Sequence, residues 1–246
     1  MAKALPNWLT SKYFALLSSF GYLPFSVREA RSILGNKASI ILSKMLSCGW
    51  IDRMGRGSYR VVHPIVALME ASGAEWRSKV RQRDRLPVLE LVVARTFEVL
   101  GSKLESIAFF GSLARGELKP YSDVDILIVA RELPKRYSDR VKLIREITSC
   151  KAIDDLIIYL WKEEGVYVNF DILLIDEEEA GVTHPFYLDM TESCIMVFDR
   201  NGLLSKKIEE VKEKLKEMGA MKIEEPDGSW YWVLTPKPEA AREVEL

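Results

Sequence analysis

Asp123 and Asp125 are the residues whose type and spacing point most directly to chemistry. They are separated by one valine and lead into the apolar run at residues 126–129. On a strand, residues two positions apart project from the same face, so the two carboxylates converge on one point. Two adjacent negative charges favour a cation, and Mg²⁺ prefers hard oxygen ligands that leave room for substrate phosphates. The pair therefore predicts a Mg²⁺ site at the start of a buried strand.

Gly111 and Ser112 form a second candidate site shortly before the two aspartates. The uninterrupted apolar run at residues 107–110 is typical of a buried strand, and the glycine and serine then turn the chain into a short segment. A strand-to-helix turn presents free backbone N–H groups, a glycine lets the backbone come close to a ligand, and the serine adds a hydroxyl. These properties suit the oxygens of a di- or triphosphate, so the turn predicts a phosphate cradle.

Asp171 is the third candidate carboxylate. It stands inside residues 166–175, one of the strongest strand patterns in the chain. A lone buried carboxylate there would cost several kcal/mol unless it were paired or bound to a metal. We therefore expect Asp171 to be buried and to complete a metal site in which two ions clamp a phosphoryl group during in-line displacement.

Taken together, these motifs resemble the minimal nucleotidyltransferases of the DNA polymerase β superfamily over about residues 88–200. The residues that carry the resemblance are Gly111, Ser112, Ala114, Arg115, Gly116, Ser122, Asp123, Asp125 and Asp171. Taken singly, a Gly-Ser pair is also an ordinary turn, and Ser-Asp ahead of an apolar run is also a cap or a loop end. The combination at this spacing favours a functional site.

The resemblance implies a reaction in which a nucleoside monophosphate moves from a nucleoside triphosphate to an acceptor hydroxyl. It implies that Gly111 and Ser112 bind the triphosphate, while Arg115 steadies the phosphates or the loop. Two Mg²⁺ ions, with Mn²⁺ as an alternative, would be held by the three aspartates, which are also the expected catalytic residues. Neither the base nor the acceptor follows from the sequence: the acceptor is a nucleic-acid 3′ end, a protein hydroxyl as in antitoxin-like members, or a small molecule.

The composition of the chain bounds the broad class of protein. Of 246 residues, 48% are hydrophobic and 29% are charged, a balance typical of a soluble globular chain with one large or two ordinary domains. No apolar run approaches the roughly 20 residues that a membrane-spanning helix needs, and the N-terminal stretch lacks a signal-peptide pattern. We therefore expect a cytoplasmic protein without a membrane partner, in which Cys48, Cys150 and Cys194 are reduced thiols.

The first 66 residues predict three short helices followed by a hairpin. Apolar residues recur at helical spacing in residues 10–20, Ser26 and Glu29 form a capping box for a second helix, and Asn36 is placed to cap a third. A turn with two glycines then joins two strand-like segments. This order resembles the winged helix-turn-helix domains of archaeal and bacterial regulators. The resemblance implies DNA or RNA binding, although winged helices also serve as protein-contact domains.

The charge distribution favours different partners for the two parts of the chain. Residues 1–87 contain 14 Lys or Arg and 5 Asp or Glu, a balance of +9, so the remainder carries −10 within the formal net charge of −1. A basic N-terminal part is a candidate for binding nucleic acid. The expected nucleic-acid-binding residues are Lys37 and Lys44 on the third helix, and Arg53, Arg56 and Arg60 on the wing.

We therefore predict an α/β (α+β) chain in four parts. These are a winged helix-turn-helix at residues 1–66, a basic linker at 67–87, a nucleotidyltransferase domain at 88–200 and a C-terminal extension at 201–246. The transferase domain is expected to contain a small mixed sheet with helices on one face. The extension is expected to contain an amphipathic helix and a β-hairpin whose turn lies at residues 226–228.

Two functional hypotheses follow. The first is an active nucleotidyltransferase whose partners are a nucleoside triphosphate, an acceptor and, through the winged helix, DNA or RNA. The second is a DNA-binding transcriptional regulator or antitoxin-like protein, in which the transferase fold senses nucleotide or dimerises. The sequence leaves the oligomeric state open, with a dimer as one option.

Overall fold

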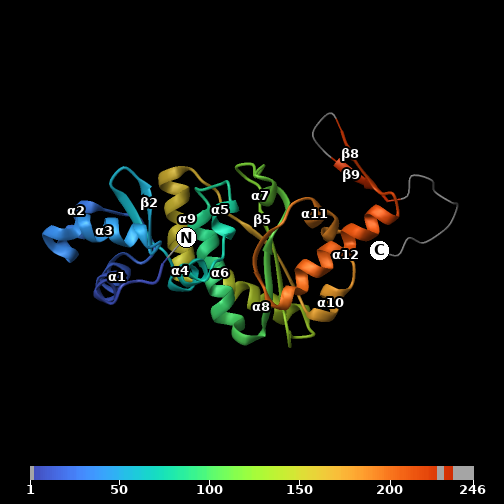
Figure 1. Cartoon of the computed structure of the whole chain (residues 1–246), viewed down its shortest axis with the longest axis horizontal. Coiled ribbons are helices and arrows are strands. Elements are labelled where there is room, and N and C mark those ends of the chain that lie inside the picture. The colour runs from blue at the N-terminus through green and yellow to red at the C-terminus, as the bar shows by residue number, and fades with distance from the viewer. Residues whose placement is uncertain (1–2, 226–229, 235–246) are drawn as a thin grey trace.

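The computed structural model describes residues 3–225 and 230–234, shown in Figure 1. Its α-helices are α1 (Asn7–Phe20), α2 (Val27–Leu34), α3 (Ala38–Ser47), α4 (Pro64–Ala71), α5 (Trp76–Lys79), α6 (Leu86–Leu100), α7 (Gly111–Arg115), α8 (Tyr137–Thr148), α9 (Lys151–Tyr159), α10 (Glu177–Gly181), α11 (Phe186–Glu192) and α12 (Leu203–Glu217). Its strands are β1 (Phe25–Ser26), β2 (Ile51–Gly55), β3 (Ser58–Val61), β4 (Leu104–Phe109), β5 (Val124–Ala130), β6 (Phe170–Ile175), β7 (Ile195–Asp199), β8 (Met221–Glu224) and β9 (Trp230–Val233). The predicted hairpin turn at residues 226–228 and the last part of the predicted extension, residues 235–246, lie outside the described residues.

A four-stranded sheet forms the centre of the molecule, with strand order β6-β5-β4-β7. Strand β4 runs antiparallel to both β5 and β7, whereas β5 and β6 are parallel. The predicted mixed sheet is therefore confirmed. The parallel pair needs a long crossover connection, and α8 and α9 supply it between β5 and β6.

Helices cover both faces of this sheet, so the prediction of helices on one face is wrong. Along β5, Ile126 and Ile128 belong to the buried cluster that includes residues of α6 and α9, whereas Leu127 and Val129 belong to a second cluster with residues of α11 and α12. Figure 1 shows α6 and α9 on one side of β5, and α11 and α12 on the other. A strand buried on both faces needs apolar residues at successive positions, which explains the near-continuous apolar run of β5.

The N-terminal part consists of α1, α2 and α3 beside a three-stranded antiparallel sheet of order β1-β3-β2. The predicted capping box is confirmed, because the Ser26 hydroxyl accepts the Glu29 backbone N–H at 3.2 Å and the Glu29 carboxylate accepts the Ser26 N–H at 2.7 Å. The predicted cap at Asn36 is wrong, because Lys37 precedes α3 and makes no side-chain cap. Within the described part of the chain, no helix is both long enough and apolar enough to span a membrane.

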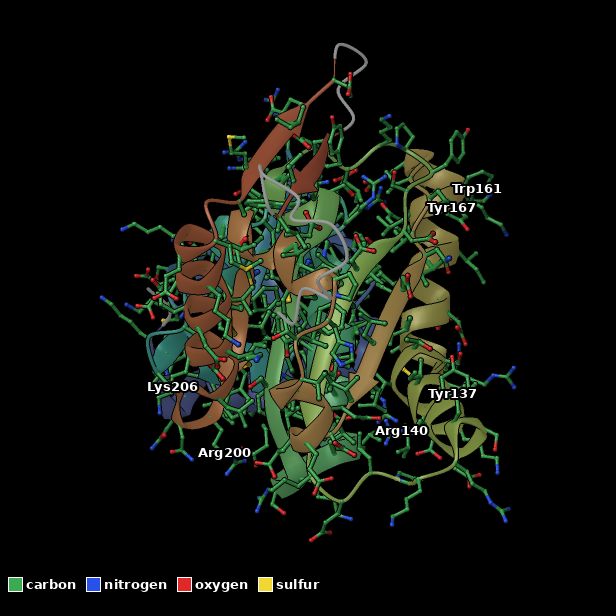
Figure 2. All side chains as sticks on the ribbon, turned by 90° about the vertical axis from the view of Figure 1, so that its right-hand side faces the viewer. Tyr137, Arg140, Trp161, Tyr167, Arg200 and Lys206 are labelled. Carbon is green, nitrogen blue, oxygen red and sulfur yellow. The ribbon has the colours of Figure 1, made fainter. Side chains whose placement is uncertain are left out.

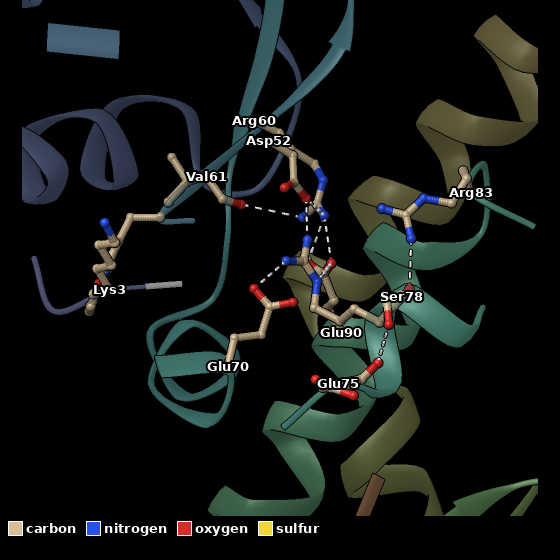
Figure 3. Close-up of polar contacts among 11 residues, drawn as sticks. Lys3, Asp52, Arg60, Val61, Glu70, Glu75, Ser78, Arg83 and Glu90 are labelled. Carbon is tan, nitrogen blue, oxygen red and sulfur yellow. Dashed lines mark hydrogen bonds and ion pairs between the residues drawn. The ribbon is translucent and has the colours of Figure 1, made fainter. Parts of the chain in front are cut away.

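A buried ion network joins this N-terminal part to α6 (Figure 3). Arg60 on β3 is only 1% exposed and pairs with Asp52 on β2 and with Glu90 on α6. Arg77 on α5 donates to Glu90 at 2.7 Å and to Glu70 on α4 at 2.8 Å. Burial raises the pKa of Glu90, and the charges of Arg60 and Arg77 oppose that rise. The network therefore holds β3, α4 and α5 against α6.

This network corrects the sequence prediction for Arg60. Side chains alternate between the two faces of strand β3, and Arg60 lies on the inward face, where it pairs with the buried Glu90 carboxylate. A guanidinium that is only 1% exposed and is paired with internal carboxylates does not reach the phosphates of a nucleic acid. Arg60 is therefore a structural residue of the junction with α6.

Replacing Glu90 with glutamine should lower the free energy of unfolding by about 3–5 kcal/mol, because it leaves two buried guanidinium groups without a full counter-charge. Glu98→Gln on the same helix is the matched control, since Glu98 pairs with Arg95 where both side chains are about one-third exposed; its effect should stay below about 1 kcal/mol. Urea unfolding of the two variants measures the difference. Equal stabilities would show that the network does not hold the junction.

Candidate functional site

Asp125 and Asp171 lie side by side at the start of the two parallel strands. They are direct register partners on β5 and β6, and paired residues on neighbouring strands project from the same face. Asp171 is exposed, because β6 is an edge strand of the sheet. The prediction that Asp171 is buried is therefore wrong, whereas its predicted proximity to Asp125 agrees with the register.

Asp123 is the third predicted ligand, and its negative charge also raises the pKa of Asp125. It immediately precedes β5 and is exposed, and its carboxylate accepts the side-chain N–H of Asn169 at 2.9 Å. Across residues 3–225 and 230–234, no three His, Cys, Asp or Glu side chains are gathered closely enough to hold a metal ion. The arrangement thus offers two neighbouring carboxylates, with a third engaged by an amide nearby.

Asp125 carries the clearest electrostatic perturbation of the site. Burial raises the pKa of Asp125 to about 6, and the negative charges of Asp171 and Asp189 add to the rise. The Arg115 charge opposes it. A carboxylate that is both partly buried and surrounded by like charges suits the binding of a hard cation, which would remove the repulsion. The donor set at this end of the sheet therefore fits a divalent metal ion such as Mg²⁺.

Gly111 brings the backbone turn into direct contact with this carboxylate. Its φ of +64° lies in the left-handed region, and a Cβ atom built there would stand 1.9 Å from Asp125 Oδ2. The N–H of Phe110 also donates to the backbone carbonyl of Asp125 at 3.2 Å. Glycine is therefore required for two reasons: the backbone conformation and the lack of space. Ser112 follows Gly111 in the first turn of α7.

Asp189 is a residue of the site that the sequence reasoning missed. It lies on α11, and its carboxylate accepts Arg115 Nη1 at 2.5 Å. Arg115 also donates to Glu117 at 2.9 Å. Because 74 positions separate Asp189 from Arg115, no local pattern in the sequence signals this contact. The predicted role of Arg115 in steadying the loop or the phosphates thus involves an internal carboxylate partner.

The other predicted binding residues lie in the N-terminal part, away from this site. Lys37 and Lys44 are exposed around α3, and Arg53 and Arg56 are exposed on the β2–β3 hairpin. Arg60, as described above, is buried. Four of the five predicted contacts are therefore on the surface.

Known proteins that resemble this chain are nucleotidyltransferases. Residues 93–218 match the family described as "Nucleotidyltransferase domain". Over 143 residues, the chain is 27% identical to "Putative protein adenylyltransferase MJ1305" of Methanocaldococcus jannaschii, with 56% of this chain and 88% of the relative covered. A solved "putative nucleotidyltransferase" from Sulfolobus solfataricus is 22% identical over 52% of this chain and 90% of its own, with a TM-score of 0.31.

A second solved structure is a complex of tri-AMPylated Shewanella oneidensis HEPN toxin with MNT antitoxin. The matched chain is 18% identical over 52% of this chain and 91% of its own, with a TM-score of 0.31. Both structural likenesses are weak.

The family match spans half of the chain, from α6 to the end of α12, and it includes the glycine turn and all three predicted aspartates. The chain belongs to this nucleotidyltransferase family, and it is a nucleotidyltransferase enzyme, as the sequence motifs predict. Nucleotidyltransferases of this type generally use divalent metal ions, which agrees with the paired carboxylates at the end of the sheet.

Gly111→Ala should lower the free energy of unfolding by about 2–4 kcal/mol, because it combines backbone strain with a clash against Asp125. Gly101→Ala is a matched control: its φ of +53° is also left-handed, but no atom lies within 4 Å of the added Cβ. The control should cost about 1–2 kcal/mol. Denaturant unfolding compares them, and an equal loss in both variants would mean that the Asp125 contact imposes no constraint.

Asp125→Asn should stabilise the metal-free protein at pH 8. A carboxyl whose folded pKa is raised from 3.8 to about 6 binds its proton more tightly when folded, so ionisation opposes folding as pH rises through that window. The shift corresponds to about 3 kcal/mol, and solvent screening of this half-exposed group reduces the expected gain to about 1–2 kcal/mol. Melting curves in EDTA at pH 8 and below pH 4 measure the gain, which should vanish at the lower pH. A destabilised variant at pH 8 would contradict the repulsion.

Proposed function

We propose that this chain transfers an adenylyl group from ATP to a hydroxyl group of a protein acceptor, with divalent metal ions bound at the end of the sheet. The observation that carries the proposal is the placement of Gly111 directly against Asp125, with Asp171 as its strand neighbour. A phosphate bound at the Gly111 turn would then lie close to the Asp125 carboxylate, with Asp171 on the neighbouring strand. The relative named as a protein adenylyltransferase supports both the adenylyl group and the protein acceptor.

In the proposed reaction, the acceptor oxygen attacks the α-phosphorus of ATP, and the bond from that phosphorus to the bridging oxygen breaks, releasing pyrophosphate. Gly111, Ser112 and Arg115 would bind the phosphates, and Asp171 would accept the proton of the acceptor hydroxyl. Two Mg²⁺ ions, or Mn²⁺, held by the aspartates at positions 123, 125 and 171, would neutralise charge on the phosphates.

An exposed aromatic surface beside the site supports a protein acceptor. Tyr121 is 77% exposed and its ring lies 6.1 Å from that of Tyr167, which in turn lies 6.3 Å from Trp161. Figure 2 shows Trp161 and Tyr167 together on one edge of the molecule. Tyr121 lies two positions before Asp123 in the chain, so the exposed aromatic residues lie next to the candidate site. Clustered exposed aromatic rings are typical of protein contact surfaces.

Asp171→Asn tests the catalytic role. Asparagine keeps the shape of the side chain but cannot accept the proton and is a poorer ligand for a hard cation. Because Asp171 is exposed, the variant should fold normally and bind Mg-ATP nearly as well as the parent, while turnover falls by about 10²–10⁴. Asp139→Asn, on the distant helix α8, should change neither. Full turnover by the Asp171 variant would remove this residue from the mechanism.

We also infer that the N-terminal part is a winged helix-turn-helix that binds nucleic acid, as in a transferase that also acts as a regulator. The supporting observation is the outer face of α3, where Ser39, Ser43 and Lys44 line an open groove. Arg53 and Arg56 project from the neighbouring hairpin. Hydroxyl and cationic groups on a helix and a wing suit base edges and phosphates, respectively.

The double variant Arg53→Ala/Arg56→Ala should weaken DNA binding and reduce the slope of log K against log salt by about 2, since each lost phosphate contact removes about one unit. Lys206→Ala/Lys212→Ala, on the outer face of α12, removes the same charge elsewhere and should leave the slope unchanged. Fluorescence anisotropy on the DNA upstream of the gene measures both. The assignment fails if the two double variants show the same salt slope as the parent.

A further inference from the structure

The β8–β9 hairpin lies beyond the residues that match the nucleotidyltransferase family, which end at 218. Within the part of the chain that the structure describes, β8 and β9 pair only with each other, and they follow α12 (Figure 1). Trp230, the first residue of β9, nevertheless reaches the candidate site: the Arg115 guanidinium lies 5.7 Å from the centre of the Trp230 ring. The hairpin thus contacts the arginine of the glycine-rich motif.

Lys222 is a second cation on the same ring. Its ammonium lies 4.8 Å from the centre of the Trp230 ring. Lys222 also interacts electrostatically with Asp189, the carboxylate that pairs with Arg115. Burial raises the pKa of Asp189, and the positive charges of Arg115 and Lys222 oppose that rise. Arg115, Asp189, Lys222 and Trp230 therefore form one group of interacting side chains, drawn from α7, α11 and the two hairpin strands.

Lys222 is positioned by ion pairs that a bound phosphate group can replace. Lys222 pairs with Glu192 at 3.2 Å and with Glu224 at 3.5 Å, and the Glu224 side chain is 75% exposed. Long, partly exposed ion pairs contribute little stability. An ammonium group has three rotatable donors and binds phosphate as a compact charge. Two cations on one aromatic ring repel each other, so an added anion between them is favourable.

We propose that Lys222 contacts the β- and γ-phosphates of the bound nucleotide and that Trp230 holds it, together with Arg115, over the phosphate cradle. The proposal rests on the proposed adenylyl transfer and extends its nucleotide site to a segment outside the family domain. It gives the hairpin a defined role, because the pyrophosphate that leaves carries the negative charge that Lys222 neutralises.

The test compares the affinities of ATP and AMP in the presence of Mg²⁺, measured by isothermal titration on the full chain. Lys222→Ala should weaken ATP binding about tenfold, the effect of losing one charge-assisted hydrogen bond, and leave AMP binding unchanged because AMP lacks the β- and γ-phosphates. Lys222→Arg should retain most of the ATP affinity. Lys206→Ala is the control; Figure 2 shows Lys206 at the end of the molecule away from the hairpin, and this variant should bind ATP like the parent.

Variants of Trp230 provide a second, independent test. Trp230→Ala should weaken ATP binding by a similar factor, whereas Trp230→Phe, which keeps an aromatic face for both cations, should lose less. Unchanged ATP affinity in Lys222→Ala overturns the proposal. An equal loss of ATP and AMP affinity also overturns it, since the hairpin would then only support the fold. A parent protein that binds neither nucleotide contradicts the proposed function itself, which separates that failure from failure of the hairpin assignment.

Discussion

The contact between the Asp125 carboxylate and the backbone of Gly111 is the constraint on which the rest of the site depends. It brings the turn between β4 and α7 against the first residues of β5, at a distance that only a glycine permits. A phosphate-binding turn and a carboxylate ligand are useful to the same nucleotide only if they lie this close. The antiparallel pairing of β4 and β5 and the parallel pairing of β5 and β6 then fix where Asp171 lies relative to both.

This arrangement concentrates negative charge at one end of the sheet. Asp171 and Asp189 both lie within electrostatic range of Asp125, and their repulsion adds to burial in raising the Asp125 pKa. The fold tolerates this because the remainder of β5 is buried on both faces by two hydrophobic clusters. Such local instability is expected of a site that is completed by a bound cation, since the ion removes the repulsion that the isolated chain must bear.

The elements of the transferase part could be predicted well from the sequence because they depend on local signals. The apolar run before Gly111 and the helical pattern of residues 203–218 both correspond to observed elements. The unbroken apolar run of β5 also indicates a strand that is buried on both faces. The prediction of helices on only one face of the sheet does not take this signal into account.

The errors concern contacts between residues far apart in the chain. The position of Arg60 on the hairpin predicts an exposed wing residue. Its side chain is instead buried because it pairs with Glu90, which lies 30 positions later in the chain. Part of the positive charge of the N-terminal region is therefore neutralised internally. Asp171 was expected to be buried, but the edge position of β6 exposes it. Asp189 and the hairpin residues near Arg115 have no local motif and become visible only when α11 and β9 are placed in space.

If this site transfers the nucleotidyl part of ATP, the fate of a labelled phosphate shows it. The purified chain is incubated with Mg²⁺ and a cell extract, using ATP labelled at the α-phosphate in one reaction and at the γ-phosphate in a parallel one. We expect that the α-label becomes attached to protein, that the γ-label is released as pyrophosphate, and that the Asp125→Asn variant attaches neither. Attachment of the γ-label would indicate phosphoryl transfer, and attachment of neither label, with Mg²⁺ or Mn²⁺, would contradict nucleotidyl transfer.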